Sequence, residues 1–108
     1  MSKHTPGPWV VGPVDDTVVT HLGADGVRRE VAQIDGDYNE PDLWPVMEAN
    51  ARLIAAAPDL LDEARKQVTW LRHLRTEAVG SLRGSLIDGI DQSIKYLSAA
   101  IAKAEGRS

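Results

Sequence analysis

The sequence predicts an α+β fold: a small N-terminal antiparallel β-sheet, made of a hairpin and an edge strand, then a short helix and an antiparallel helical hairpin. β-Branched runs and turn residues fill the chain to about residue 42, and Ala-rich sequence follows over 43–57. From 58 to 106, apolar residues recur at steps of three and four, which is typical of amphipathic helices. With 108 residues the chain is expected to form a single domain.

Two β-branched runs predict the hairpin. Thr17–Leu22 reads as one strand, and Val27–Asp35 reads as the return strand after the turn pair Asp25-Gly26. Val10-Val11 predicts a short edge strand, preceded by Trp9 as an anchor for the N-terminus. Neither face of the return strand is cleanly apolar. The sheet is therefore expected to be partly buried, or to be completed by another subunit.

Proline and aspartate mark the expected helix ends. Asp42 is predicted to cap a helix that starts near Leu43 and has Pro45 in its first turn. Pro58 has no N–H and disfavours helical geometry at the residue before it, so it should stop or kink this helix and open the next one. The second helix should run to about Val79. A break over residues 80–85 should then make the last two helices an antiparallel hairpin.

The last helix carries an apolar seam that is close to a heptad pattern and that Gly106 should end. A small sheet cannot cover such a seam, so the sequence predicts that the helical hairpin packs against a second copy. The candidate oligomer seam consists of Leu86, Ile90, Ile94, Leu97 and Ile101.

Composition and charge limit the classes of function. The formal net charge is −4, and most of the excess acid lies in the N-terminal half, so nucleic acid is a less favoured partner. There is no cysteine, which excludes disulfides and thiolate chemistry, and no apolar run is long enough to cross a bilayer. The first residues lack the apolar segment of a signal peptide, and a cytosolic protein is expected.

No motif for catalysis is present. The three histidines, His4, His21 and His73, show no metal-ligand spacing, and there is no phosphate-binding loop or nucleophile elbow. Residues 35–40 place oxygen ligands at alternate positions, but the sixth position counted from Asp35 is not glycine and the twelfth is not glutamate, as a calcium loop requires, so a turn explains them better. The sequence therefore predicts a protein that is not an enzyme and has no metal or cofactor.

Basic residues on the second helix form the best candidate binding site. Arg65, Arg72 and Arg75 are spaced to fall near one face, and Trp70 lies among them in the sequence. The favoured interpretation is a solvated face whose arginines pair with Asp62, Glu77 or Asp91. The alternative is a site for an anionic partner: an acidic protein patch, nucleic acid or a phosphate-bearing ligand. An exposed Trp70 would favour stacking on a base, and a buried one would exclude it.

Two segments resemble a known family. His4-Thr5-Pro6-Gly7-Pro8-Trp9 and the central motif EANARLIAAAPDLL, residues 48–61, are similar to small proteins encoded by tailed bacteriophages and prophages. The similarity covers roughly residues 4–62. These proteins have no assigned molecular function, so the resemblance implies no catalytic residues. It implies a phage genome and a setting in the host cytoplasm.

The leading hypothesis is therefore a non-catalytic phage accessory protein that associates with itself and acts by protein–protein interaction. A first alternative is an anti-defence protein, which inhibits a host immune complex or sequesters a nucleotide signal between subunits. A second alternative is a weak nucleic-acid binder that uses the basic helix face. For the central motif itself, a structural role is favoured over a ligand site.

Overall fold

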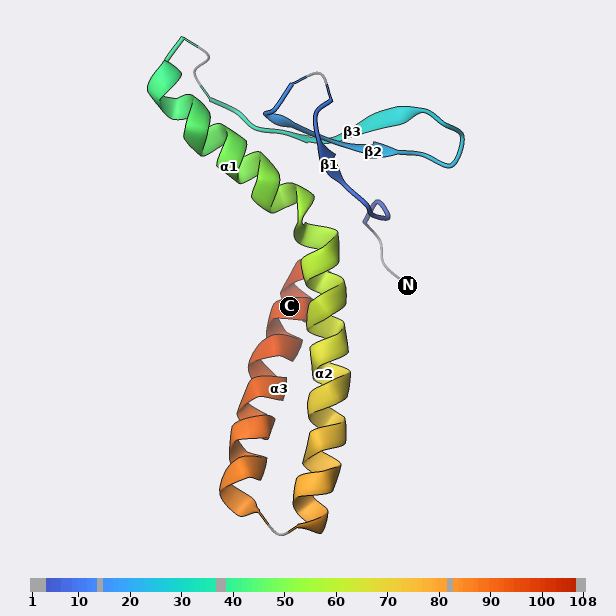
Figure 1. The fold of residues 1–108 in the computed structure, drawn as a ribbon, viewed down its shortest axis with the longest axis vertical. Coiled ribbons are helices and arrows are strands. Elements are labelled where there is room, and N and C mark those ends of the chain that lie inside the picture. The colour runs from blue at the N-terminus through green and yellow to red at the C-terminus, as the bar shows by residue number, and fades with distance from the viewer. Residues whose placement is uncertain (1–3, 14, 37–38, 82, 107–108) are drawn as a thin grey trace. The chain divides into compact units, whose positions relative to one another are not determined.

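A computed structural model describes residues 4–13, 15–36, 39–81 and 83–106. It shows the α+β fold that the sequence predicts (Figure 1). The chain forms two compact units, Met1–Leu60 and Leu61–Ser108, each of which is described by itself. The expected single domain stays a prediction. Asp37 and Tyr38 of the predicted connector, and Leu82 of the predicted break, lie outside the described residues.

The sheet of the first unit has three antiparallel strands in the order β1-β2-β3. These strands are β1 (Val10–Val11), β2 (Val18–Leu22) and β3 (Arg28–Gln33). The edge strand and the hairpin are confirmed. Gly26 has φ +80°, and the backbone N–H of Gly23 donates to the carbonyl of Val27 at 2.8 Å, which closes the hairpin turn.

A β-bulge interrupts the pairing of β2 with β3. Val19 pairs with Ala32, but its neighbour Thr20 pairs with Glu30, so Val31 is the extra residue. The bulge breaks the strict alternation expected for the return strand, and Val31 and Ala32 are both half-buried. The remaining residues of β3 are exposed, in agreement with a sheet that is only partly buried.

Two helices precede the hairpin in chain order. The 3-10 turn η1 (Pro41–Leu43) leads into α1 (Trp44–Ala55). Pro45 lies in the first turn of α1, as predicted, but Asp42 is not its cap. Pro41 suits the first position of η1, and Asp42 therefore lies inside that turn. The cap position of α1 is occupied by Leu43, which makes no side-chain hydrogen bond there.

The core of the first unit lies between α1 and the sheet. α1 packs against β1 and β2 with Met47 and Ala51, which are buried together with Val19. The hydroxyl of Thr20, the next residue of β2, is also buried, and it donates to the carbonyl of Gly12 at 2.8 Å. One side of α1 therefore belongs to the core.

The second unit is the antiparallel helical hairpin, whose two helices lie side by side in Figure 1. It contains most of α2 (Ala57–Gly80) and all of α3 (Gly84–Ala104). α1 ends at Ala55 and α2 begins at Ala57, so Pro58 accompanies a one-residue break as expected. Gly106, with φ +75°, follows α3 and donates to the carbonyl of Lys103 at 3.2 Å, which confirms it as the residue that ends the helix.

Candidate functional site

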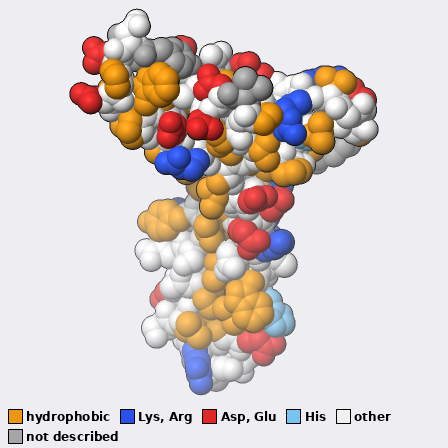
Figure 2. Space-filling view, turned by 45° about the horizontal axis from the view of Figure 1, so that its top comes forward, with side chains coloured by type: hydrophobic (Ala, Val, Ile, Leu, Met, Phe, Trp, Pro, Cys, Tyr) orange, Lys and Arg blue, Asp and Glu red, His pale blue; other side chains and the backbone are white. Residues whose placement is uncertain are grey.

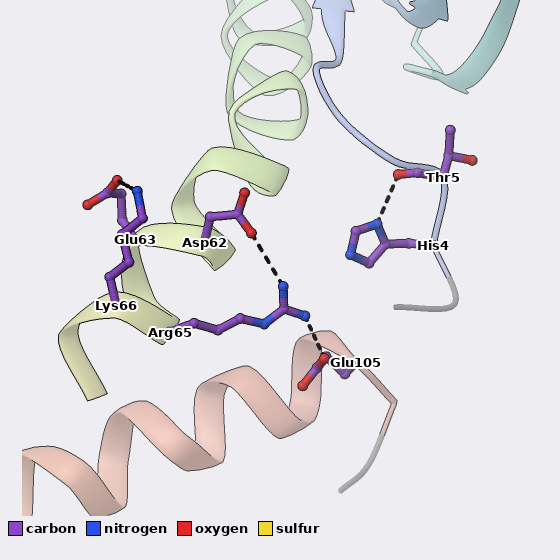
Figure 3. Close-up of polar contacts among 7 residues, drawn as sticks. All are labelled: His4, Thr5, Asp62, Glu63, Arg65, Lys66 and Glu105. Carbon is purple, nitrogen blue, oxygen red and sulfur yellow. Dashed lines mark hydrogen bonds and ion pairs between the residues drawn. The ribbon is translucent and has the colours of Figure 1, made fainter. Parts of the chain in front are cut away.

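Arg65 of α2 is held between two carboxylates. Its guanidinium donates to Glu105, which follows α3, at 2.6 Å and to Asp62 at 3.3 Å (Figure 3). Glu105 is only 18% exposed at its side chain, so this pair lies partly away from water. Arg65 consequently ties the start of α2 to the end of α3, and pairing with Asp62 agrees with the favoured interpretation of the basic face.

Arg75 makes a second bridge between the same two helices. Its Nε donates to Asp91 of α3 at 2.5 Å, as the favoured interpretation expects. This hydrogen bond, with the negative charge of Asp91, raises the pKa of Arg75 further above its ordinary value. Two of the three candidate arginines thus have carboxylate partners within the hairpin.

Arg72 lies with Arg65 at a groove of about 350 Å³ on the hairpin. Val68 and Ile101 form its floor, since both are buried. Within the described part of the chain, Arg72 makes no ion pair. The groove is lined by Arg65, Val68, Thr69, Arg72, Ser98, Ile101 and Glu105.

Trp70 is 53% exposed, but the structure does not place it with the arginines. It follows Arg65 by five residues and so lies about 140° further around the helix. Its ring contacts His73, with ring centroids 5.6 Å apart. Figure 2 shows exposed hydrophobic side chains, with a histidine beside them, on the hairpin face in view. Trp70 and the groove arginines therefore belong to different surfaces of α2.

The candidate oligomer seam on α3 faces α2 of the same chain for much of its length. Ile90 and Ile101 are buried, and Ile94 and Leu97 are half-buried. Leu86 is 48% exposed. The apolar seam thus forms the core of the hairpin, and its use between subunits stays a prediction that rests on its exposed edge.

The two motifs that suggested the family meet in the first unit. A Cβ atom added at Gly7 would lie 2.9 Å from Cβ of Pro58, so the absence of a side chain lets the N-terminal segment pack on the buried proline. Trp9 folds over the same segment: its Nε1 donates to the carbonyl of Thr5 at 3.1 Å, and its ring packs edge-on against His4. The N-terminal motif is therefore a structural strap.

The outer side of α1 and the first turn of α2 carries an apolar surface that the sequence analysis missed. Val46, Leu53 and Leu60 are 56%, 65% and 56% exposed. Ala49 is exposed and Ala56 half-buried between them. We call this surface the outer stripe: Val46, Ala49, Leu53, Ala56 and Leu60. Its spacings of three, four, three and four can be read from the sequence, but alanines at two of its five positions weaken the apolar pattern.

A second hollow, of about 340 Å³, lies at the sheet. Its lining mixes two arginines and two carboxylates with small residues: Gly12, Pro13, Asp15, Val18, Thr20, Arg28, Arg29 and Glu30. Asp15 accepts hydrogen bonds from the hydroxyl and the backbone N–H of Thr17, which lower its pKa. These contacts engage the carboxylate in a local turn.

The described residues provide neither a metal-binding cluster nor a membrane-spanning helix. No group of three or more histidines, aspartates or glutamates there could hold a metal ion. No helix in that part of the chain is long and apolar enough to cross a membrane.

The chain is a small α+β protein in which a sheet-and-helix unit precedes a helical hairpin. Its exposed large apolar side chains lie mainly on the helices. Comparison with protein families places it more closely. The model of the family described as Salmonella phage P22 protein Y8K6 matches residues 1–108, and the chain belongs to this phage protein family. No curated protein and no solved structure matches the chain.

Proposed function

We propose that this phage protein is a non-catalytic accessory factor that associates with itself and acts by protein–protein interaction. The observation that carries the proposal is the outer stripe, in which three large aliphatic side chains stand more than half exposed along one line. Contiguous exposed apolar surface on a small protein marks an interaction site more often than isolated exposed residues do.

The hairpin supports the same proposal independently. Trp70, Leu86 and Tyr96 are exposed on it, at 53%, 48% and 64%. An exposed tryptophan offers a partner a large apolar area with few rotatable bonds, which is why this residue is frequent among the residues that dominate binding energy. A partner protein of the host or its defence systems is the proposed target of these exposed side chains.

Light scattering coupled to gel filtration tests self-association. The mass should rise with concentration from the 11.7 kDa of one chain towards twice that value, because association follows mass action. A mass that stays at one chain up to a concentration of about 1 mM, where even contacts worth about 4 kcal/mol are populated, would reject the proposal.

A second candidate function is the binding of a phosphate-bearing ligand in the hairpin groove. It is favoured by one observation: Arg65 and Arg72 line the same groove, beside the hydroxyls of Thr69 and Ser98. Calorimetry with cyclic nucleotides should show binding that Arg72→Ala abolishes. An absence of heat with the wild-type protein would reject this candidate. Nucleic acid as the partner stays a prediction.

A further inference from the structure

We infer that the outer stripe binds the same stripe of a second copy in antiparallel orientation, with Arg52 beside Asp59 of the partner subunit. This inference deepens the proposed self-association and rests on it. It names the surface, the orientation and the charged pair, none of which follows from self-association alone.

The spacing of the stripe is the first support. Val46, Ala49, Leu53, Ala56 and Leu60 follow the alternating three- and four-residue steps that let two helices pack side by side along a seam. At the break near Pro58, Ala56 keeps right-handed helical angles, and its carbonyl accepts from the N–H of Leu60 at 2.9 Å, as in a helix.

The other side of α1 is already occupied. Met47 and Ala51 are buried against the sheet. Gly36 also packs against Met47, so closely that a side chain there would overlap its sulfur. The outer stripe is therefore the side of α1 that is free to receive another helix.

Side-chain size selects the antiparallel orientation. In an antiparallel pair with Leu53 opposite Ala56 of the partner subunit, the same register puts Leu60 opposite the partner's Ala49. Every leucine then meets an alanine, so the four layers formed by Ala49, Leu53, Ala56 and Leu60 have similar volumes, which suits the dense packing of protein interiors. In a parallel pair, leucine would face leucine and alanine would face alanine, so bulky layers would hold the small ones apart.

Charge selects the same register. Arg52 and Asp59 each precede a leucine of the stripe, at the flanking position of the heptad. With Leu53 opposite Ala56 of the partner subunit, Arg52 falls opposite the partner's Asp59, and twofold symmetry repeats the pair. Both residues are exposed, and within the described residues neither makes an ion pair. In a parallel pair, Arg52 would fall opposite Ala57 of the partner subunit.

Charge reversal tests the register. By sedimentation equilibrium, Arg52→Glu and Asp59→Lys should each weaken dimerisation about tenfold, because each turns two attractive pairs into two repulsive ones. The double variant R52E/D59K should regain the wild-type dissociation constant to within about threefold. If the single changes weakened dimerisation only by disturbing the monomer, the double variant would dimerise even more weakly. Its recovery would therefore identify the pair between subunits.

Mixing the two single variants gives a second readout of the same pairing. A heterodimer of R52E with D59K has one Glu–Lys pair and one native Arg–Asp pair, so the equimolar mixture should dimerise more tightly than either variant alone. A double variant as weak as the singles, or a mixture no tighter than its components, would overturn the inference.

Leu53→Asp tests the apolar part of the surface. It places a charge at the centre of the stripe and should abolish dimerisation, while circular dichroism stays that of a folded chain because residue 53 is exposed. Leu22→Asp is the matched control, since Leu22 is an exposed leucine of β2. A wild-type protein that stays monomeric rejects self-association itself. A dimer that tolerates Leu53→Asp rejects only the outer stripe.

Discussion

At the residue scale, a single methyl group added at Gly7 should lower the stability of the fold considerably. A Cβ atom there would lie 2.9 Å from a carbon of the rigid, buried ring of Pro58. Gly7→Ala should therefore lower the free energy of unfolding by about 1–3 kcal/mol, because neither partner can rotate away. Urea unfolding followed by tryptophan fluorescence measures the change.

Gly89 provides the opposite case. It lies inside α3, and nothing stands within 4 Å of a Cβ atom added to it. Gly89→Ala should raise the free energy of unfolding by about 0.5–1 kcal/mol, because alanine favours the helix. If Gly7→Ala were as well tolerated as Gly89→Ala, the contact between Gly7 and Pro58 would be wrong.

The carboxylate of Asp25 should make the stability of the β-hairpin depend on pH in the acidic range. A hydrogen bond from Arg29, followed by one from the backbone N–H of Val27, holds the pKa of Asp25 below its ordinary value of 3.8. A lowered pKa in the folded state stabilises the fold above the ordinary value, and this contribution is lost as pH falls through the folded pKa.

Thermal unfolding at two pH values measures this contribution. Asp25→Asn should show a smaller fall in melting temperature than the wild-type protein between about pH 5 and about pH 2.5, since it lacks the group that titrates there. Asp16→Asn removes a negative charge from another exposed turn and serves as the control. Equal falls for the wild type and Asp25→Asn would contradict the role of the Arg29 pair.

At the scale of elements, the sequence predicted what local chemistry decides. Val10-Val11, the Asp25-Gly26 turn, the break near Pro58 and the end at Gly106 depend on residues close in the chain, and all are confirmed. The contact of Gly7 with Pro58 joins residues far apart in the sequence, so no local pattern indicates it. The bulge at Val31 was not predicted either, because strict alternation is the simplest expectation for a strand.

For the candidate site too, the predictions that depend on helix spacing were confirmed, and the one that depends on proximity in the sequence was not. The pairing of Arg65 and Arg75 with Asp62 and Asp91 follows from helix spacing and from the hairpin, and both pairs are present. Trp70 was grouped with the arginines because it lies among them in sequence, whereas the turn of the helix directs it elsewhere. Proximity along a helix therefore predicts a shared face only at steps of three, four or seven.

The seam of α3 yields a prediction for the hairpin. Ile90 is buried and Leu86 about half exposed. Ile90→Ala should lower the free energy of unfolding by about 2–5 kcal/mol, because it opens a cavity in the core. Leu86→Ala should lower it by less than about 1 kcal/mol. Urea unfolding at a concentration too low for association separates the two, and equal losses would contradict the packing of the seam.

At the scale of the whole molecule, each of the three described α-helices leaves a large apolar side chain exposed: Leu53 on α1, Trp70 on α2 and Leu86 on α3. In α1 the buried and exposed apolar sides lie back to back, with Met47 in the core and Leu53 outside. A helix with apolar residues on two sides is typical of one that packs between two layers. The sheet supplies one layer, and a second copy of the chain is the layer that we propose for the other.

Site-directed cross-linking tests this account most directly. The chain contains no cysteine, so Arg52→Cys and Asp59→Cys each introduce a single thiol. With a short thiol-specific cross-linker, an equimolar mixture of the two variants should give a covalent dimer in much higher yield than either variant alone, since residue 52 lies opposite residue 59 of the partner subunit. Equal yields from the mixture and from the separate variants would contradict the antiparallel outer stripe.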